Sequence, residues 1–187
     1  KIRKYKFSKR TVFLSIVAGK KINFFNKFLP KNSKFIRVMP NMPATINQSM
    51  SCLLANKFIS KKNKDIINSL FLKIGKTFWL KKENEINKVT AISGSGPGYI
   101  FLIVDAFEKA ALELGLDQNI TKKLVHQTFL GSINLMAKEK VSSLILANTV
   151  AIKGGTTEAG INVFKKNKIL HKKIIKVIKA AYDRANQ

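Results

Sequence analysis

Cysteine is almost absent from this chain of 187 residues, and the single Cys52 has no partner for an intrachain disulfide. No histidine or second cysteine lies near it at a spacing typical of metal ligands, so the sequence predicts no metal site. The expected location is a reducing compartment, the cytoplasm, with Cys52 as a small buried side chain.

Long apolar runs are also missing. No uninterrupted run approaches the roughly 18 residues that a membrane-spanning helix requires. The best candidate, Val12–Ala18, has only the length of a strand. We therefore expect no membrane partner.

Acidic residues are scarce: 10 of them face 35 lysines and arginines, which gives a formal net charge of +25. Such a charge is usual in proteins that bind nucleic acid. Arginine, however, supplies only Arg3, Arg10, Arg37 and Arg184, and the lysines are spread along the whole chain. Because base reading and bidentate phosphate contacts favour arginine, we expect no specific nucleic-acid partner. The alternative, a nucleic-acid role, would appear as strongly salt-dependent binding with little sequence preference.

The first half of the chain alternates β-rich and helical segments. Val12–Val17 is typical of a strand that is buried on both faces of a parallel sheet. A short helix within Lys20–Leu29 and a strand at Lys34–Met39 complete a strand, helix, strand step. Four further elements are expected: a strand within Met50–Phe58, a helix capped by Ser60 and ended by Gly75, a short strand at Thr77–Leu80, and a polar linker at Lys81–Asn87.

The second half has helical periodicity throughout. Tyr99–Leu114 is apolar on most faces, which predicts a deeply buried helix that a second subunit could help to cover. Ile169–Ala185 is amphipathic, with a stripe of apolar residues expected to be buried: Leu170, Ile174, Ile175, Val177 and Ile178. Two more helices are expected between them, from Asn119 or Thr121 to about Lys138 and from Ser142 to Asn148.

The densest backbone signal is Ala91–Phe101, in which three glycines and two serines precede an apolar helical run. The pattern predicts a loop that feeds a helix, with Ser95 or Gly96 at the N-cap and Pro97 in the first turn. Free amides at such an end can hold a carboxylate or phosphate. The alternative is a joint at which the glycines let a helix and a strand approach closely.

The second dense signal is Lys153–Gly160, where two glycines and two threonines precede another helical pattern. It also predicts a helix N-terminus, with the amides of Gly155–Thr157 facing a small anion. A plain capped turn is the alternative. The spacing of a nucleotide-binding P-loop is absent.

Side chains for acid–base catalysis are few. His126 and His171 lie on amphipathic helices with no partner carboxylate or serine evident, and no carboxylate pair stands out. Any catalysis is therefore expected to depend on a cofactor and on positioned backbone and hydroxyl groups.

Four stretches together resemble pyrroline-5-carboxylate reductases: VFLSIVAG at 12–19, RVMPNMPA at 37–44, VTAISGSGPGYIF at 89–101 and GGTTEAG at 154–160. The resemblance implies an α/β Rossmann-type domain, present as its carboxyl half only, followed by an all-α dimerisation domain. Residues 1–86 would be the partial NAD(P)-binding domain, and residues 87–187 the helical dimerisation and substrate-binding domain. A homodimer is implied, with larger assemblies of dimers left open.

The implied reaction is hydride transfer from NADPH or NADH to the imine carbon of 1-pyrroline-5-carboxylate, which gives L-proline. By resemblance, Thr157 is the catalytic residue that contacts the ring nitrogen. The implied substrate-binding residues are Gly154, Gly155, Thr156 and Thr157 for the carboxylate loop, with Ser93, Gly94, Ser95 and Gly96 beside the substrate. The implied cofactor-binding residues are Ala18, Gly19, Met39, Pro40 and Asn41.

The sequence departs from the family pattern in two ways. No glycine-rich phosphate loop precedes Val12, so an amino-terminally truncated chain with poor NAD(P)H binding is expected. Ala151 and Ile152 replace two hydroxyl side chains ahead of the glycine pair, which removes potential substrate contacts. The alternative to an active reductase is an inactive fragment that retains only the dimerisation module.

Overall fold

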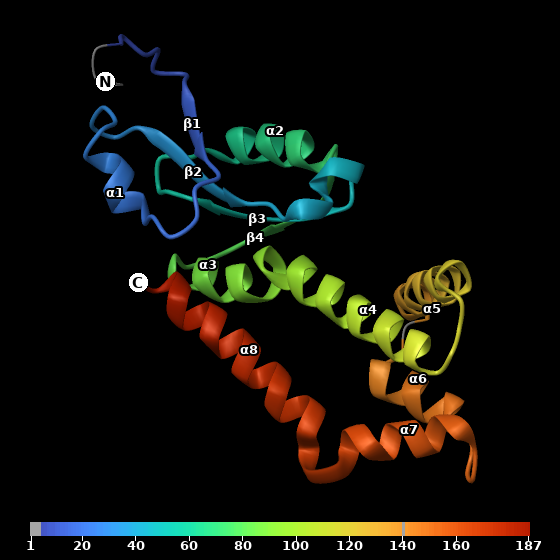
Figure 1. Ribbon diagram of the computed structural model, residues 1–187. Helices are drawn as coiled ribbons and strands as arrows, with labels where there is room; N and C mark the ends of the chain where they lie inside the picture. Colours follow the sequence, from blue (N-terminus) through green and yellow to red (C-terminus); the bar gives the residue numbers. More distant parts are fainter. Residues whose placement is uncertain (1–4, 140) are drawn as a thin grey trace. The chain divides into compact units, whose positions relative to one another are not determined.

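A computed structural model describes residues 5–139 and 141–187, so the first four residues of the expected Rossmann-type domain lie outside it. The chain divides into two compact units: residues up to Pro97 together with Val177–Gln187, and Gly98–Lys176. The first contains a sheet with its covering helices, and the second is helical (Figure 1).

The first unit is built on one four-stranded sheet, with the strands in chain order. The parallel pairs are β1 with β2 and β3 with β4, and β2 pairs antiparallel with β3. The strand bounds are β1 Val12–Ser15, β2 Lys34–Met39, β3 Ser49–Ala55 and β4 Gly75–Trp79. The expected strand, helix, strand step is thus confirmed, with α1 (Ile22–Asn26) between two parallel strands.

Helices cover both faces of the sheet. On one face, Ile36, Val38 and Leu53 pack against Ile67 of α2 (Lys61–Leu72). On the other face, Cys52 and Leu54 pack with Ile86 of α3 (Asn84–Val89). On that same face Phe35 stacks on Phe25 of α1. Alternate side chains of β2 and β3 point to opposite faces of the sheet, so both faces carry apolar clusters. Together these clusters form the main apolar core of the unit.

Several local expectations change in this unit. β1 was expected to be buried on both faces, but it is an edge strand and Leu14 is exposed. Ser60 does cap α2, through a hydrogen bond from the Asn63 amide, yet Gly75 begins β4 rather than ending the helix. Its φ of +143° lets it lie directly against the Ser49 backbone.

The prediction of a polar linker at Lys81–Asn87 is wrong, because helix α3 begins at Asn84 and its Ile86 is buried. A continuous helix then runs from Asn84 to Glu113. By length and composition this one helix could cross a membrane, although the core helix of a water-soluble protein meets the same criterion. The earlier expectation concerned an uninterrupted apolar run, which this helix does not contain because Asp105 interrupts it. Its mean hydropathy is nevertheless high enough for a membrane span.

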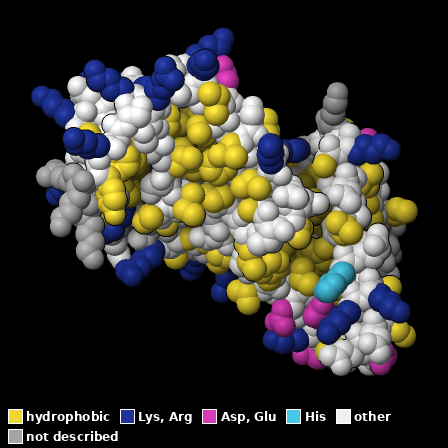
Figure 2. Space-filling view, turned by 90° about the horizontal axis from the view of Figure 1, so that it is seen from above, with side chains coloured by type: hydrophobic (Ala, Val, Ile, Leu, Met, Phe, Trp, Pro, Cys, Tyr) yellow, Lys and Arg dark blue, Asp and Glu magenta, His cyan; other side chains and the backbone are white. Residues whose placement is uncertain are grey.

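The second unit consists of helices with little core of their own. They are α4 Gly96–Glu113 (from Gly98 on), α5 Gln118–Lys138, α6 Ser143–Val150, α7 Thr156–Lys165, the 3₁₀ turn η4 Lys166–Lys168 and the first part of α8 Ile169–Ala185. Only Thr121 and Val125 are buried among its described residues. In the single chain, α4 is therefore not deeply buried, and the apolar stripe of α8 is largely exposed. Hydrophobic side chains gather in broad open patches on the face shown in Figure 2.

Replacing Gly75 with alanine should destabilise the sheet by about 2 kcal/mol or more, because the new methyl group would overlap the Ser49 backbone at a strained φ. Urea unfolding followed by circular dichroism measures this loss. The control is Gly131→Ala in α5, where the nearest atom to a new methyl is the Gln127 amide at 3.9 Å. This change should leave stability within about 1 kcal/mol. Equal unfolding midpoints for the two variants would contradict the role of Gly75.

Candidate active site

The carboxyl ends of β1 and β2 lie at one edge of the sheet, because the strands are parallel and Ser15 pairs in register with Arg37. The turn Ala18–Gly19 follows β1, and Gly19 has a positive φ of +72°. Met39 is the last residue of β2, and Pro40 and Asn41 follow it. All five predicted cofactor-binding residues therefore lie at the same carboxyl-terminal end of the sheet, where ligands of open α/β sheets bind.

The glycine and serine segment does not begin a new helix. Thr90–Gly94 forms a π-helical turn (η3) that connects α3 to α4, and the Ser95 amide donates to the Thr90 carbonyl at 2.8 Å. The prediction of an N-cap at Ser95 or Gly96 with free amides is therefore wrong. The periodicity did not reveal this because a π turn adds one residue to an otherwise continuous helix.

Pro97 explains how this turn connects to the sheet. Proline has no N–H, so the carbonyl four residues earlier, that of Ser93, loses its usual helical donor. The side-chain amide of Asn41 donates to this carbonyl at 3.2 Å. A missing hydrogen bond in the helix is thus replaced by one from the end of β2.

Asn41 uses its remaining polar groups nearby. Its Oδ1 accepts from the Met50 amide at 3.0 Å, and its own backbone amide donates to Ser49 Oγ at 3.3 Å. The side chain therefore holds β2, β3 and the π turn together.

Gly94 allows the same approach. A Cβ at this position would lie 2.8 Å from Met39 Cε and 3.4 Å from Thr90 Cγ2. This agrees with the alternative interpretation, in which glycine permits a helix and a strand to pack closely. Within the first unit, the structure thus brings Ser93 and Gly94 together with Met39 and Asn41.

The loop before α7 begins a helix as predicted, but the expectation that the Gly155 amide is free for an anion is wrong. Gly155 is the N-cap, Gly154 has a φ of +76°, and α7 begins at Thr156. The Gly154 amide donates to Glu158 Oε2 at 2.7 Å, and the Gly155 amide donates to the Ile152 carbonyl at 2.9 Å. Within the described chain, these bonds leave the amides of Thr156, Thr157 and Glu158 as the first-turn donors for a ligand. This loop belongs to the second unit, and the sheet edge belongs to the first.

A family model for pyrroline-5-carboxylate reductase dimerisation matches residues 83–187. The chain belongs to this reductase family. The curated pyrroline-5-carboxylate reductase of Haemophilus influenzae is 34% identical over 154 residues, which are 82% of this chain and 57% of the relative. The chain thus spans little more than half the length of that relative.

Two solved reductase structures confirm the fold class. The enzyme from Coxiella burnetii matches with a TM-score of 0.87 and 35% identity over 92% of this chain and 63% of its own. The Plasmodium falciparum pyrroline carboxylate reductase, solved with NADP bound, has a TM-score of 0.87 and 27% identity over 94% and 70%. Membership of the reductase family therefore rests on both sequence and fold.

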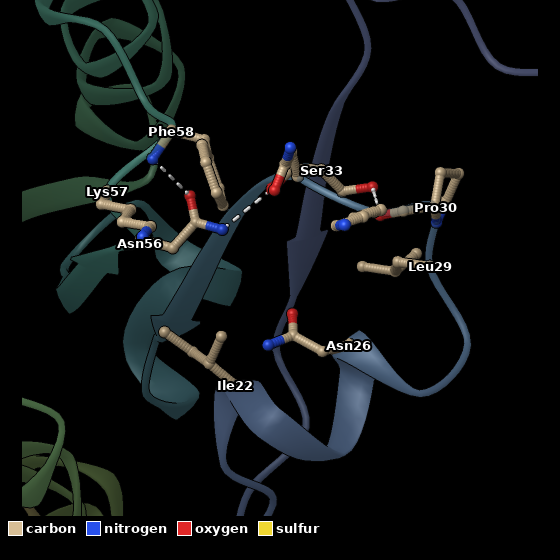
Figure 3. A pocket seen from close by; sticks show the side chains of 10 residues that line it. Ile22, Asn26, Leu29, Pro30, Ser33, Asn56, Lys57 and Phe58 are labelled. Carbon is tan, nitrogen blue, oxygen red and sulfur yellow. Dashed lines mark hydrogen bonds between the residues drawn. The ribbon is translucent and has the colours of Figure 1, made fainter.

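A cavity of about 460 Å³ elsewhere in the first unit contains none of the predicted site residues (Figure 3). Its walls come from α1, the loop before β2 and the end of β3. The polar groups of Asn56 are already used, since Oδ1 accepts from the amides of Phe35 and Phe58 and Nδ2 donates to the Ser33 carbonyl at 2.8 Å. Ser33 Oγ donates to the Pro30 carbonyl. This cavity is therefore not part of the candidate site.

Two side-chain pairs were not evident from the sequence. His126 of α5, expected to have no partner, is hydrogen-bonded to Glu108 of α4, with Nε2 2.7 Å from Oε1. Arg37 pairs with Glu83 inside the first unit. Arg37 stands out in the sequence as a charge inside the apolar run of β2. The partners themselves were not evident, because sequence spacing does not reveal contacts between residues that are distant along the chain.

Replacing Asn41 with alanine should reduce the stability of the first unit by about 1–2 kcal/mol, because the Ser93 carbonyl and the Met50 amide both lose their partner. Trp79, the only tryptophan, reports unfolding of this unit by fluorescence. Asn26→Ala is the matched control, since among the described residues its exposed side-chain amide donates a hydrogen bond only to Asn23, and its effect should stay within about 0.5 kcal/mol. If both variants unfolded at the same urea concentration, the proposed junction would carry no stability.

Proposed function

We propose that this chain is the carboxyl-side part of a pyrroline-5-carboxylate reductase, which reduces 1-pyrroline-5-carboxylate to L-proline in the cytoplasm with NADPH or NADH. The observation that carries the proposal is family membership combined with the predicted residues of the sheet edge and the π turn in direct contact. The assignment of residues 1–86 to the cofactor and 87–187 to dimerisation and substrate is part of this proposal, as is the absence of a nucleic-acid or membrane partner.

The sheet edge fits the nicotinamide end of the cofactor. Gly19 has a positive φ and nothing near its missing side chain, so the turn can approach a ligand closely. Ala18 and Met39 supply apolar surface there, and the cofactor would provide a hydride when bound. Asn41 has its side chain engaged with the π turn, so its part in cofactor binding is to shape this edge.

The α7 loop fits the substrate. The amides of Thr156 and Thr157 stand at the positive end of the helix dipole, which favours the substrate carboxylate. Gly154 and Gly155 form the turn that exposes these amides. The Gly154 amide donates to Glu158 Oε2, so in this structure that amide is used within the loop.

Thr157 is proposed to contact the ring nitrogen through its hydroxyl group. A protonated imine accepts hydride more readily than a neutral one. A hydroxyl group hydrogen-bonded to the ring nitrogen would hold the imine in place for this step. Ser93–Gly96 are proposed to lie beside the substrate. No strong acid is required, in agreement with the few acid–base side chains of the chain.

Thr157→Ala should lower kcat/KM by about 10- to 100-fold through loss of a hydrogen bond to a charged group, and Thr157→Ser should restore most of it. The assay is oxidation of thiazolidine-4-carboxylate by NADP+. It uses the chain as printed and a chimera that adds the unmatched part of the H. influenzae relative. Thr149→Ala is the control, since its hydroxyl group donates only to the Ile145 carbonyl. Activity in neither protein would favour the inactive fragment.

A homodimer is proposed to cover the exposed apolar faces of the second unit. α4 and α5 there form an open groove of about 470 Å³ whose lining includes Phe101, Ile103 and Leu130. A surface of this kind is typical of a subunit interface.

Phe101→Glu should shift the chain from dimer to monomer in sedimentation equilibrium, because the new charge would be buried in the interface. Ile66→Glu on the exposed side of α2 provides a matched control and should remain dimeric. Two variants of equal mass distribution would overturn this placement of the interface.

A further inference from the structure

Arg37 is a charged residue inside the core of the first unit. Its side chain is 4% exposed, and Nη1 lies 3.2 Å from Glu83 Oε1. Burial lowers the pKa of the Arg37 guanidinium, and the hydrogen bond and charge of Glu83 oppose that shift. Within the described residues, Glu83 is the only carboxylate in an ion pair with Arg37.

The same carboxylate oxygen caps helix α1. Glu83 Oε1 accepts the backbone amide of Ile22, the first residue of α1, at 2.6 Å. Lys21 occupies the N-cap position and its side chain makes no capping bond. A lysine cannot accept a hydrogen bond, so a residue 61 positions further along the chain supplies the missing cap.

Three segments that lead into the proposed site meet at this carboxylate. Helix α1 begins at Ile22, shortly after the turn that contains Ala18 and Gly19. Arg37 lies two residues before Met39 on β2. Glu83 itself immediately precedes α3, the helix that continues into the π turn with Ser93.

We propose that Glu83 is a positioning residue that holds the turn after β1, the end of β2 and the start of α3 in register at the cofactor edge. The inference rests on the proposed reductase function for its consequence, and on the two hydrogen bonds of Glu83 Oε1 for its geometry. Glutamine could still accept from Ile22, but it would leave the buried guanidinium without a counter-charge.

The first measurement is amide hydrogen exchange by NMR in the printed chain and its variants. Glu83→Ala should speed exchange of the Ile22 amide by about tenfold or more, the loss expected for a hydrogen bond to a charged group. Its proton resonance should also move upfield. Glu83→Gln should retain part of the protection. Glu85→Gln is the matched control, because Glu85 caps only the exposed amides of Lys81 and Lys82.

The second measurement is NADPH titration of the same proteins, followed at the amides of Ala18 and Gly19. Glu83→Gln should raise the dissociation constant for NADPH by about tenfold relative to Glu85→Gln, although both variants lose one carboxylate near α3. Unchanged Ile22 exchange in Glu83→Ala, or unchanged NADPH affinity in Glu83→Gln, overturns the positioning role. If NADPH shifts no resonance even in the parent chain and in the completed chimera, the proposed function fails. The capping role of Glu83 is then decided by the exchange data.

Discussion

The hydrogen bond from the Asn41 side chain to the Ser93 carbonyl is the contact on which the proposed cofactor edge depends. It exists because Pro97 cannot donate to that carbonyl, so a polar group in the middle of a long helix needs a donor from outside. The donor comes from the end of β2, and Gly94 leaves the space in which Met39 can approach. The helix is thus joined to the sheet because Pro97 lacks an N–H and Gly94 lacks a side chain.

The two units are stabilised differently. The first has apolar clusters on both faces of its sheet, and each element is fixed by packing and by hydrogen bonds between distant residues. The second buries almost none of its large apolar side chains within the single chain. Its helices are defined locally by caps such as Asp117 and Ser142, while their packing energy must come from other surfaces. In the first unit tertiary packing stabilises the elements, whereas in the second unit local capping defines the helices and little packing is present within the chain.

Elements with strong local signals were predictable from sequence. β2 and α8 have the expected bounds, and the α7 loop begins a helix where its glycines and threonines indicate. The π turn, the helix in place of a linker, and the pairs Arg37–Glu83 and His126–Glu108 were not predictable. Each depends on a neighbour that is distant in sequence: the sheet beneath Ile86, the donor Asn41, or a carboxylate on another element. The resemblance named candidate site residues, whereas the engagement of the Asn41 side chain with Ser93 and Met50 is visible only in the fold.

β1 is an edge strand, and among the described residues only β2 pairs with it. Within these residues, its outer edge therefore presents unpaired backbone donors and acceptors to which a further strand could add. Lysines and arginine flank the strand at Lys9, Arg10, Lys20 and Lys21, and two copies that approach edge to edge would bring these like charges together. The basic residues around this edge thus oppose edge-to-edge pairing of two copies of the described chain, as charged residues do beside exposed strands.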